Sequence, residues 1–170
     1  RDRHKGLDLI KYVFEDIIRL GCKFAILGSG EKIYEDFFSE MHYRYPDRVG
    51  LTIGFVPELS KKIYAGADMF LMPSQSEPCG LAQMIALRYG TIPIVRETGG
   101  LRDSIHDAGD KNGNGFTFKS YNAHDMLDAV VRARAYYDDK MKWGRLVNTA
   151  LKQNFSWTKS AKDYIALYND

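Results

Sequence analysis

Apolar residues recur along the chain with two different spacings, and the two alternate from segment to segment. Between residues 7 and 20 the apolar positions lie three or four apart, which predicts an amphipathic helix that Gly21 ends. Residues 24–27 form a short apolar run before a glycine-rich turn, which predicts a buried strand. The same alternation predicts strands at 49–55, 69–72, 92–95 and 115–118, and helices at 31–45, 57–65, 80–89 and 100–106.

After residue 118 the pattern becomes helical, with helices expected at 123–137, 140–153 and 157–168. Strands that alternate with helices predict an α/β fold, in which a Rossmann-like, doubly wound parallel sheet carries helices on both faces. Such a sheet usually opens with a strand, whereas this chain opens with a charged turn and a helix. We therefore expect a first strand either upstream of residue 1 or hidden in the chain start. No repeat or linker divides residues 1–170, so one domain is expected.

Composition narrows the function classes. The chain is 45% hydrophobic and 27% charged, which is typical of a globular domain and excludes disordered, collagen-like and membrane-spanning classes. The net charge is +2 and the charges are interspersed, which disfavours nucleic-acid binding. The start, RDRHKG, has no initiator Met or signal peptide, so we expect a piece of a longer protein.

Cysteine and histidine usage indicates neither a disulfide framework nor a metal site. Cys22 and Cys79 are the two cysteines, and their number favours a reducing cytoplasm. The four histidines do not stand at ligand spacing with a Cys or another His, so no bound metal is expected.

The segment 73–81 is the strongest candidate for chemistry, because it joins a predicted strand to a predicted helix. Ligands of doubly wound sheets bind beyond the carboxyl ends of the strands, near helix N-termini. Gly80 allows close backbone approach, and the free N–H groups of the following turn suit an anion such as a diphosphate. Glu77 would repel phosphate and so is better suited to sugar hydroxyls, although a plain helix-N-terminal carboxylate explains it equally well.

Other candidates at this edge are weaker when taken alone. Lys5 could neutralise a phosphate, but an ordinary solvated lysine is the simpler explanation. Phe55 could stack on a nucleobase, but core packing is the simpler explanation. Cys79 is assigned contact with the ligand and no covalent role. The Gly28-Ser29-Gly30 turn lacks the full dinucleotide-binding spacing, and no acidic residue follows the next strand, which counts against a dehydrogenase.

Long stretches of the chain resemble bacterial glycogen synthases and plant starch synthases. They include KGLDLI, AILGSGE, the segment from GFVPEL through EPCGL to YGTIPIVRETGGLRDSI, and FSWTKSAKDYIALY, in this order over essentially the whole chain. The resemblance implies a GT-B glycosyltransferase, in which two Rossmann-like domains face across a cleft. Residues 1–170 would be its C-terminal, donor-binding domain, and the N-terminal acceptor-side domain would be absent from this chain.

The resemblance also implies an activity. The family transfers glucose from ADP-glucose or UDP-glucose, with retention of configuration, to the 4-hydroxyl at the end of an α-1,4-glucan. It uses no metal and no cofactor, and it works in the cytoplasm or, in plants, in the plastid. The fragment alone is expected to be inactive, because half of the cleft is missing.

Residue roles carry over by position. Lys5 matches the lysine on the donor diphosphate, and Glu77 matches the carboxylate that holds the transferred glucose; these two are the expected catalytic residues. The expected substrate-binding residues lie at the base edge and at the phosphate turn: Ile53, Gly54, Phe55, Cys79, Gly80 and Leu81.

The sequence departs from the family pattern at a few positions. Ala82 stands where many members have Thr, which removes one hydroxyl contact to the donor. The family's phosphate-binding arginine has no secure match, although Arg1 or Arg3 approximates it.

Two alternatives stay open. One is another GT-B transferase of the sucrose or trehalose-phosphate synthase type, which Ile85 disfavours because a second glutamate is common there. The other is a nucleotide-binding or regulatory module without catalysis.

Overall fold

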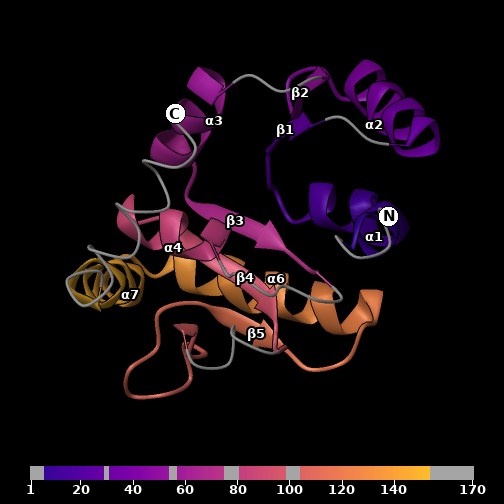
Figure 1. The fold of residues 1–170 in the computed structure, drawn as a ribbon. Coiled ribbons are helices and arrows are strands. Elements are labelled where there is room, and N and C mark those ends of the chain that lie inside the picture. The colour runs from indigo at the N-terminus through magenta and orange to yellow at the C-terminus, as the bar shows by residue number, and fades with distance from the viewer. Residues whose placement is uncertain (1–5, 29–30, 54–56, 75–80, 99–103, 154–170) are drawn as a thin grey trace.

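The computed structural model describes residues 6–28, 31–53, 57–74, 81–98 and 104–153, and the alternation of helix and strand predicted from the sequence is present in them. Ser104 is the last helical residue of the segment predicted as helix 100–106, and the predicted helix at 157–168 lies outside the described residues. In chain order the elements are α1 (Leu7–Arg19), β1 (Phe24–Gly28), α2 (Lys32–Arg44), β2 (Val49–Ile53), α3 (Pro57–Gly66), β3 (Met69–Met72), α4 (Leu81–Arg88), β4 (Ile92–Arg96), β5 (Phe116–Phe118), α6 (Ala123–Asp138) and α7 (Lys140–Gln153) (Figure 1).

All the strand pairs of the described residues are parallel, which confirms the α/β class. The strands form two sheets, one with the order β1-β2 and one with the order β3-β4-β5. The register sets Gly28 opposite Ile53 in the first sheet and Arg96 opposite Phe118 in the second. Figure 1 shows the β1-β2 pair set apart from β3, with α1 next to it.

Helices flank the strands as a doubly wound fold requires. In the second sheet β4 packs against both α4 and α6, and α7 contacts α4, α6 and β4. In the first sheet α2 packs on β2. Asn122 is the N-cap of α6. Its side chain accepts hydrogen bonds from the backbone N–H groups of His124 and Asp125, which have no partners inside the helix.

Helix α1 belongs to both hydrophobic cores. Phe14 and Ile18 pack in a cluster with α2 and β2, whereas Leu9, Val13 and Ile17 pack in a larger cluster with β3, β4, β5, α6 and α7. Apolar residues three and four positions apart cover a wide stripe of a helix, so one helix can contact two partners. Helix α1 also contacts α6 directly, and it thereby ties the first sheet to the second.

Phe14→Ala tests the smaller core. Phe14 is fully buried and stacks on Phe24 with 4.4 Å between the ring centroids. Truncation leaves a cavity, and we expect the free energy of unfolding to fall by about 3–5 kcal/mol in denaturant titration. Tyr43→Ala is the matched control, since that aromatic ring is 85% exposed, and it should change stability by less than about 0.5 kcal/mol. Equal effects of the two substitutions would contradict the assignment of the core.

Candidate functional site

Two of the eight predicted site residues lie in the part of the chain that the structure describes. Ile53 and the backbone of Leu81 are described. The remainder lie outside the described residues, and their roles stay predictions: Lys5, Gly54, Phe55, Glu77, Cys79 and Gly80.

Ile53 ends β2 at the edge where the base was expected. The register places it beside Gly28, so the carboxyl ends of both strands lie at the same level. Its side chain is 49% exposed, unlike Val49 at the other end of the strand, which is buried. An apolar side chain that is half exposed at a strand end is available for contact with a flat ring.

Leu81 is the first residue of α4, one position after the start predicted from the sequence. The first turn of an α-helix has N–H groups without partners inside the helix, and the helix dipole makes this end positive. The segment that carries Glu77 and Gly80 leads directly into this end. The start of α4 at Leu81 therefore has the free N–H groups that an anion site at this position would use.

Gly6 holds the beginning of α1 against the end of β3. Its φ angle is +79°, and a Cβ atom added there would lie 2.3 Å from the carbonyl oxygen of Pro73 and 2.6 Å from its Cγ. Only glycine tolerates both the left-handed conformation and this approach. Lys5 directly precedes Gly6, and Pro73 stands four residues before Glu77, so the two predicted catalytic residues flank segments whose backbones touch.

A polar group on the same edge was not predicted from the sequence. The Tyr121 hydroxyl donates a hydrogen bond of 2.5 Å to Oδ1 of Asp8, in the first turn of α1. The guanidinium of Arg96, the last residue of β4, lies 5.8 Å from the centroid of the Tyr121 ring, within cation–π range. Burial, together with the hydrogen bond to Asp8 and the charge of that carboxylate, raises the pKa of Tyr121.

The neighbouring strand ends are also tied together by polar contacts. The Thr117 hydroxyl donates to Glu97 Oε1 at 2.9 Å, and Asp107 accepts from the Thr117 N–H and from Arg132. These hydrogen bonds and the Arg132 charge hold the pKa of Asp107 below its ordinary value, although its burial acts in the opposite direction. Polar contacts therefore join the described strand ends at the carboxyl edge, where Arg96 is a cation among neutral and acidic groups.

Sequence signals could have identified only two of the three residues in the polar cluster of Asp8, Arg96 and Tyr121. Asp8 and Arg96 lie in the stretches KGLDLI and IVRETGG, which carry the family resemblance. Tyr121 is 113 residues from its partner Asp8, and no spacing rule relates them. Among the described residues there is no cluster of three or more His, Cys, Asp or Glu side chains suited to a metal ion.

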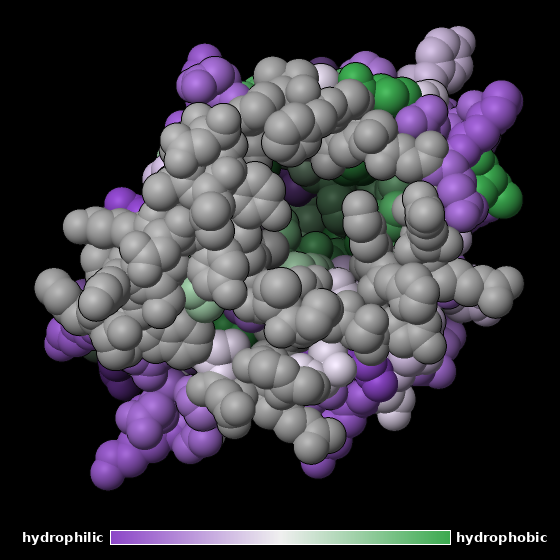
Figure 2. All heavy atoms as spheres, in the orientation of Figure 1, coloured by the Kyte–Doolittle hydropathy of each residue, from purple (hydrophilic) through white to green (hydrophobic). Residues whose placement is uncertain are grey.

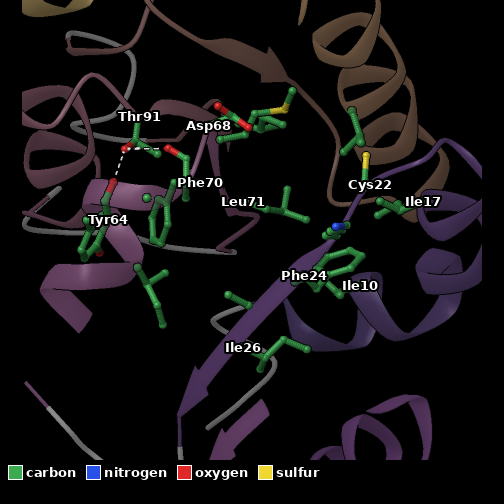
Figure 3. A pocket seen from close by; sticks show the side chains of 18 of the residues that line it. Ile10, Ile17, Cys22, Phe24, Ile26, Tyr64, Asp68, Phe70, Leu71 and Thr91 are labelled. Carbon is green, nitrogen blue, oxygen red and sulfur yellow. Dashed lines mark hydrogen bonds between the residues drawn. The ribbon is translucent and has the colours of Figure 1, made fainter. Parts of the chain in front are cut away.

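A cavity of about 880 Å³ lies between the two sheets, and its lining includes Leu7 at the start of α1. Figure 2 shows a hollow with hydrophobic residues at its floor, and Figure 3 shows Phe24 and Ile26 of β1 facing it from one side and Phe70 and Leu71 of β3 from the other. Its lining is largely apolar and does not include Ile53. Within the described part of the chain, the helices are too short or too polar to cross a bilayer.

Comparison with known proteins gives consistent matches along the chain. The profile of the family described as glycosyl transferases group 1 matches residues 1–145. A glycogen synthase of Anoxybacillus flavithermus is 53% identical over 170 residues, which is 99% of this chain and 35% of that protein. A glycogen synthase of Bacillus anthracis is 53% identical over 168 residues, again 35% of its length.

Among solved structures, the catalytic domain of starch synthase IV from Arabidopsis thaliana, bound to ADP and acarbose, matches with a TM-score of 0.83 and 40% identity. The match covers 98% of this chain and 36% of that one. The chain thus spans about a third of the length of the relatives that it matches.

Gly6→Ala tests the contact between α1 and Pro73. We expect a loss of more than about 1 kcal/mol in the free energy of unfolding, because the methyl group meets Pro73 and φ is positive. Gly66→Ala, at the end of α3 with open space around it, is the control and should be neutral or slightly stabilising in the same denaturant titration. The contact would be refuted if Gly6→Ala were as neutral as Gly66→Ala.

Tyr121→Phe tests the bond to Asp8 through pH. The pKa of Tyr121 lies above its ordinary value of 10.0 in the folded chain, so stability from the protonated phenol is complete below pH 10 and is lost as pH rises beyond it. The variant should lose about 1–3 kcal/mol at neutral pH, and its stability should fall less steeply above pH 10. Burial raises the pKa of Tyr64 to about 12, so some pH dependence remains.

The control for this titration is Tyr43→Phe, at an exposed tyrosine on α2. Its unfolding curve should follow that of the parent chain throughout. An unchanged slope above pH 10 in Tyr121→Phe would show that the phenol does not donate to Asp8.

Proposed function

Because the chain belongs to the glycosyl transferases group 1 family, we propose that it is the donor-binding domain of a glucosyltransferase of the glycogen or starch synthase type. The complete enzyme takes glucose from ADP-glucose or UDP-glucose and adds it, with retention of configuration, to the 4-hydroxyl at the end of an α-1,4-glucan. The present chain is the C-terminal domain of a two-domain GT-B enzyme. An N-terminal domain supplies the acceptor side of the cleft.

The observation that carries this proposal is the contact of Gly6 with Pro73. It brings the backbone next to Lys5 beside the segment that leads through Glu77 and Gly80 into the N-terminus of α4. A cation and a helix N-terminus on one corner suit a diphosphate, and the carboxylate of Glu77 suits sugar hydroxyls nearby.

The proposed site suits departure of the nucleoside diphosphate, which is the most difficult step of the reaction. When the bond between the anomeric carbon and the diphosphate breaks, negative charge grows on the leaving phosphate. The N–H groups at Gly80 and Leu81 and the ammonium of Lys5 would stabilise this charge with donors that are already oriented. Such donors would take the role that a divalent cation has in other transferases, so the proposed site needs no metal.

The nucleotide base would lie at the end of β2. Ile53 is exposed there, and Gly54 and Phe55 follow it; a phenyl ring at residue 55 would stack on the base. Cys79 would contact the donor beside the phosphates. The starch synthase structure that matches this chain was solved with ADP, which supports ADP-glucose over UDP-glucose as the donor.

Transfer needs both halves of the cleft. An acceptor glucan must be held in line with the anomeric carbon, and the present chain offers only the donor side. We therefore expect this domain alone to bind ADP or ADP-glucose weakly and to elongate no glucan. The proposed location of the complete enzyme is the cytoplasm, or the plastid in a plant.

Glu77→Ala and Lys5→Ala in the complete enzyme test the site. Each should lower the rate of ADP release from ADP-glucose in the presence of an α-1,4-glucan by on the order of a hundredfold, because a transition-state contact is lost. Lys32→Ala is the control, since that lysine is exposed and pairs with Asp36 on α2, and it should leave the rate unchanged. Rates like those of the parent enzyme for Glu77→Ala would overturn the assignment.

A thermal-shift titration separates the proposed function from the alternatives. ADP-glucose and ADP at a hundred times their Kd should stabilise the protein by about 2.7 kcal/mol, and NADH should not. Stabilisation without any transfer by the complete protein would instead indicate a regulatory nucleotide-binding module. Transfer to a monosaccharide in preference to a glucan would indicate another GT-B transferase.

A further inference from the structure

The loop between Ser104 and β5 contains both Asn-Gly steps of the chain. It reads DKNGNG, and the two steps are Asn112-Gly113 and Asn114-Gly115. Asparagine before glycine is prone to deamidation, because glycine has no side chain to shield its backbone nitrogen from the amide carbon of the asparagine. This loop takes no part in the proposed donor site, so the inference drawn from it does not rest on the proposed function.

Asn114 is held in place by the fold. Its exposed fraction is 1%. Its Oδ1 accepts a hydrogen bond of 2.8 Å from the backbone N–H of His106, and its Nδ2 donates to the carbonyl oxygen of Ser104 at 2.9 Å and to Oε1 of Gln153 at 2.6 Å. The side chain must lose all of these partners before it turns toward the backbone nitrogen of the next residue, and a buried amide without partners is costly.

Asn112 is in the opposite situation, although it is only two residues away. Its side chain is exposed, and within the described part of the chain its amide group has no hydrogen-bond partner. The turn around it is closed by one backbone hydrogen bond, which runs from the N–H of Gly113 to the carbonyl oxygen of Asp110 at 3.1 Å. Exposed turns open at a much lower free energy than buried segments. Opening this one bond therefore frees both reacting groups.

We propose that Asn112 is a site of spontaneous deamidation and isoaspartate formation, whereas the fold protects Asn114. The backbone nitrogen of Gly113 loses its proton and bonds to Cγ of Asn112. The bond from Cγ to Nδ2 breaks, and the side-chain nitrogen takes up a proton and leaves as ammonia. Water then opens the cyclic imide: cleavage between the nitrogen and Cγ gives aspartate, and cleavage between the nitrogen and the former backbone carbonyl gives isoaspartate. No group is oxidised or reduced.

The two products differ in their effect on the end of α7. The backbone carbonyl oxygen of Asn112 accepts a hydrogen bond of 3.2 Å from Nε2 of Gln153, the last residue of this helix. Isoaspartate routes the main chain through the former side chain and converts this carbonyl into a free carboxylate, so the contact is lost in its present geometry. Aspartate adds a charge but keeps the backbone. Isoaspartate should therefore loosen the last turn of α7, and aspartate should not.

Tandem mass spectrometry of the complete polypeptide, aged at mildly alkaline pH, tests the modification. Residue 112 should exchange the NH₂ of its amide for OH, and residue 114 should convert at least about tenfold more slowly, because local opening exposes only the first. An isoaspartate methyltransferase with a labelled methyl donor should mark residue 112. Conversion should be faster at higher pH, since the attacking nitrogen must lose its proton.

The same chain unfolded in urea is the control for the effect of the fold. Both Asn-Gly steps are then open to solvent and should convert at similar rates. Equal conversion of Asn112 and Asn114 in the folded protein would overturn the proposal, because the fold would give no protection. An intact Asn112 in the folded protein, under conditions in which the unfolded chain converts, would overturn it as well.

Variants separate the modification from other effects of ageing. Amides in the last turn of α7 should exchange with solvent about fivefold faster in the aged parent protein than in the fresh one, because one hydrogen bond is lost. Aged Asn112→Gln should keep the fresh rate, since a longer side chain closes its ring far more slowly, and fresh Asn112→Asp should also keep it. The amides of α2, which contains no Asn, are the internal comparison. Faster exchange in aged Asn112→Gln would overturn the assigned effect on α7.

Discussion

Burial of α1 is the interaction on which the rest of the structure depends. Its apolar side chains divide between two cores, with Phe14 and Ile18 in one and Val13 and Ile17 in the other. The described strands do not join the two sheets to each other. The packing of this helix, together with its contact to α6, therefore sets the position of β1-β2 relative to β3-β4-β5.

The same packing determines the geometry of the carboxyl edge. Once α1 is buried, its first residue has a fixed position, and Gly6 must meet Pro73. The hydrogen bond from Tyr121 to Asp8 secures the same end of the helix from the side of β5 and α6. A core contact and a polar contact thus converge on the turn that precedes α1. The backbone at Gly6 is thereby held next to the end of β3.

The sequence predicted the elements well because their signals are local. Spacing three and four apart marked α1, and short apolar runs marked β1, β3 and β4, with boundaries correct to within about two residues. Pairing is not local, so the separation into two sheets was not predictable from periodicity. The link between Tyr121 and Asp8 was missed for the same reason. The start of α4 was predicted to within one position, at Gly80 instead of Leu81, because its signal is also local.

The contact that fixes the start of α1 also bears on the proposed donor site. Doubly wound folds bind their ligands beyond the carboxyl ends of the strands, at the edge between the two halves of the sheet. Gly6 meets Pro73 at that edge, so the described chain on either side of the proposed site starts from neighbouring backbone positions. A side chain at residue 6 would force these two backbones apart, so the packing of α1 and the proposed function make the same demand on this glycine.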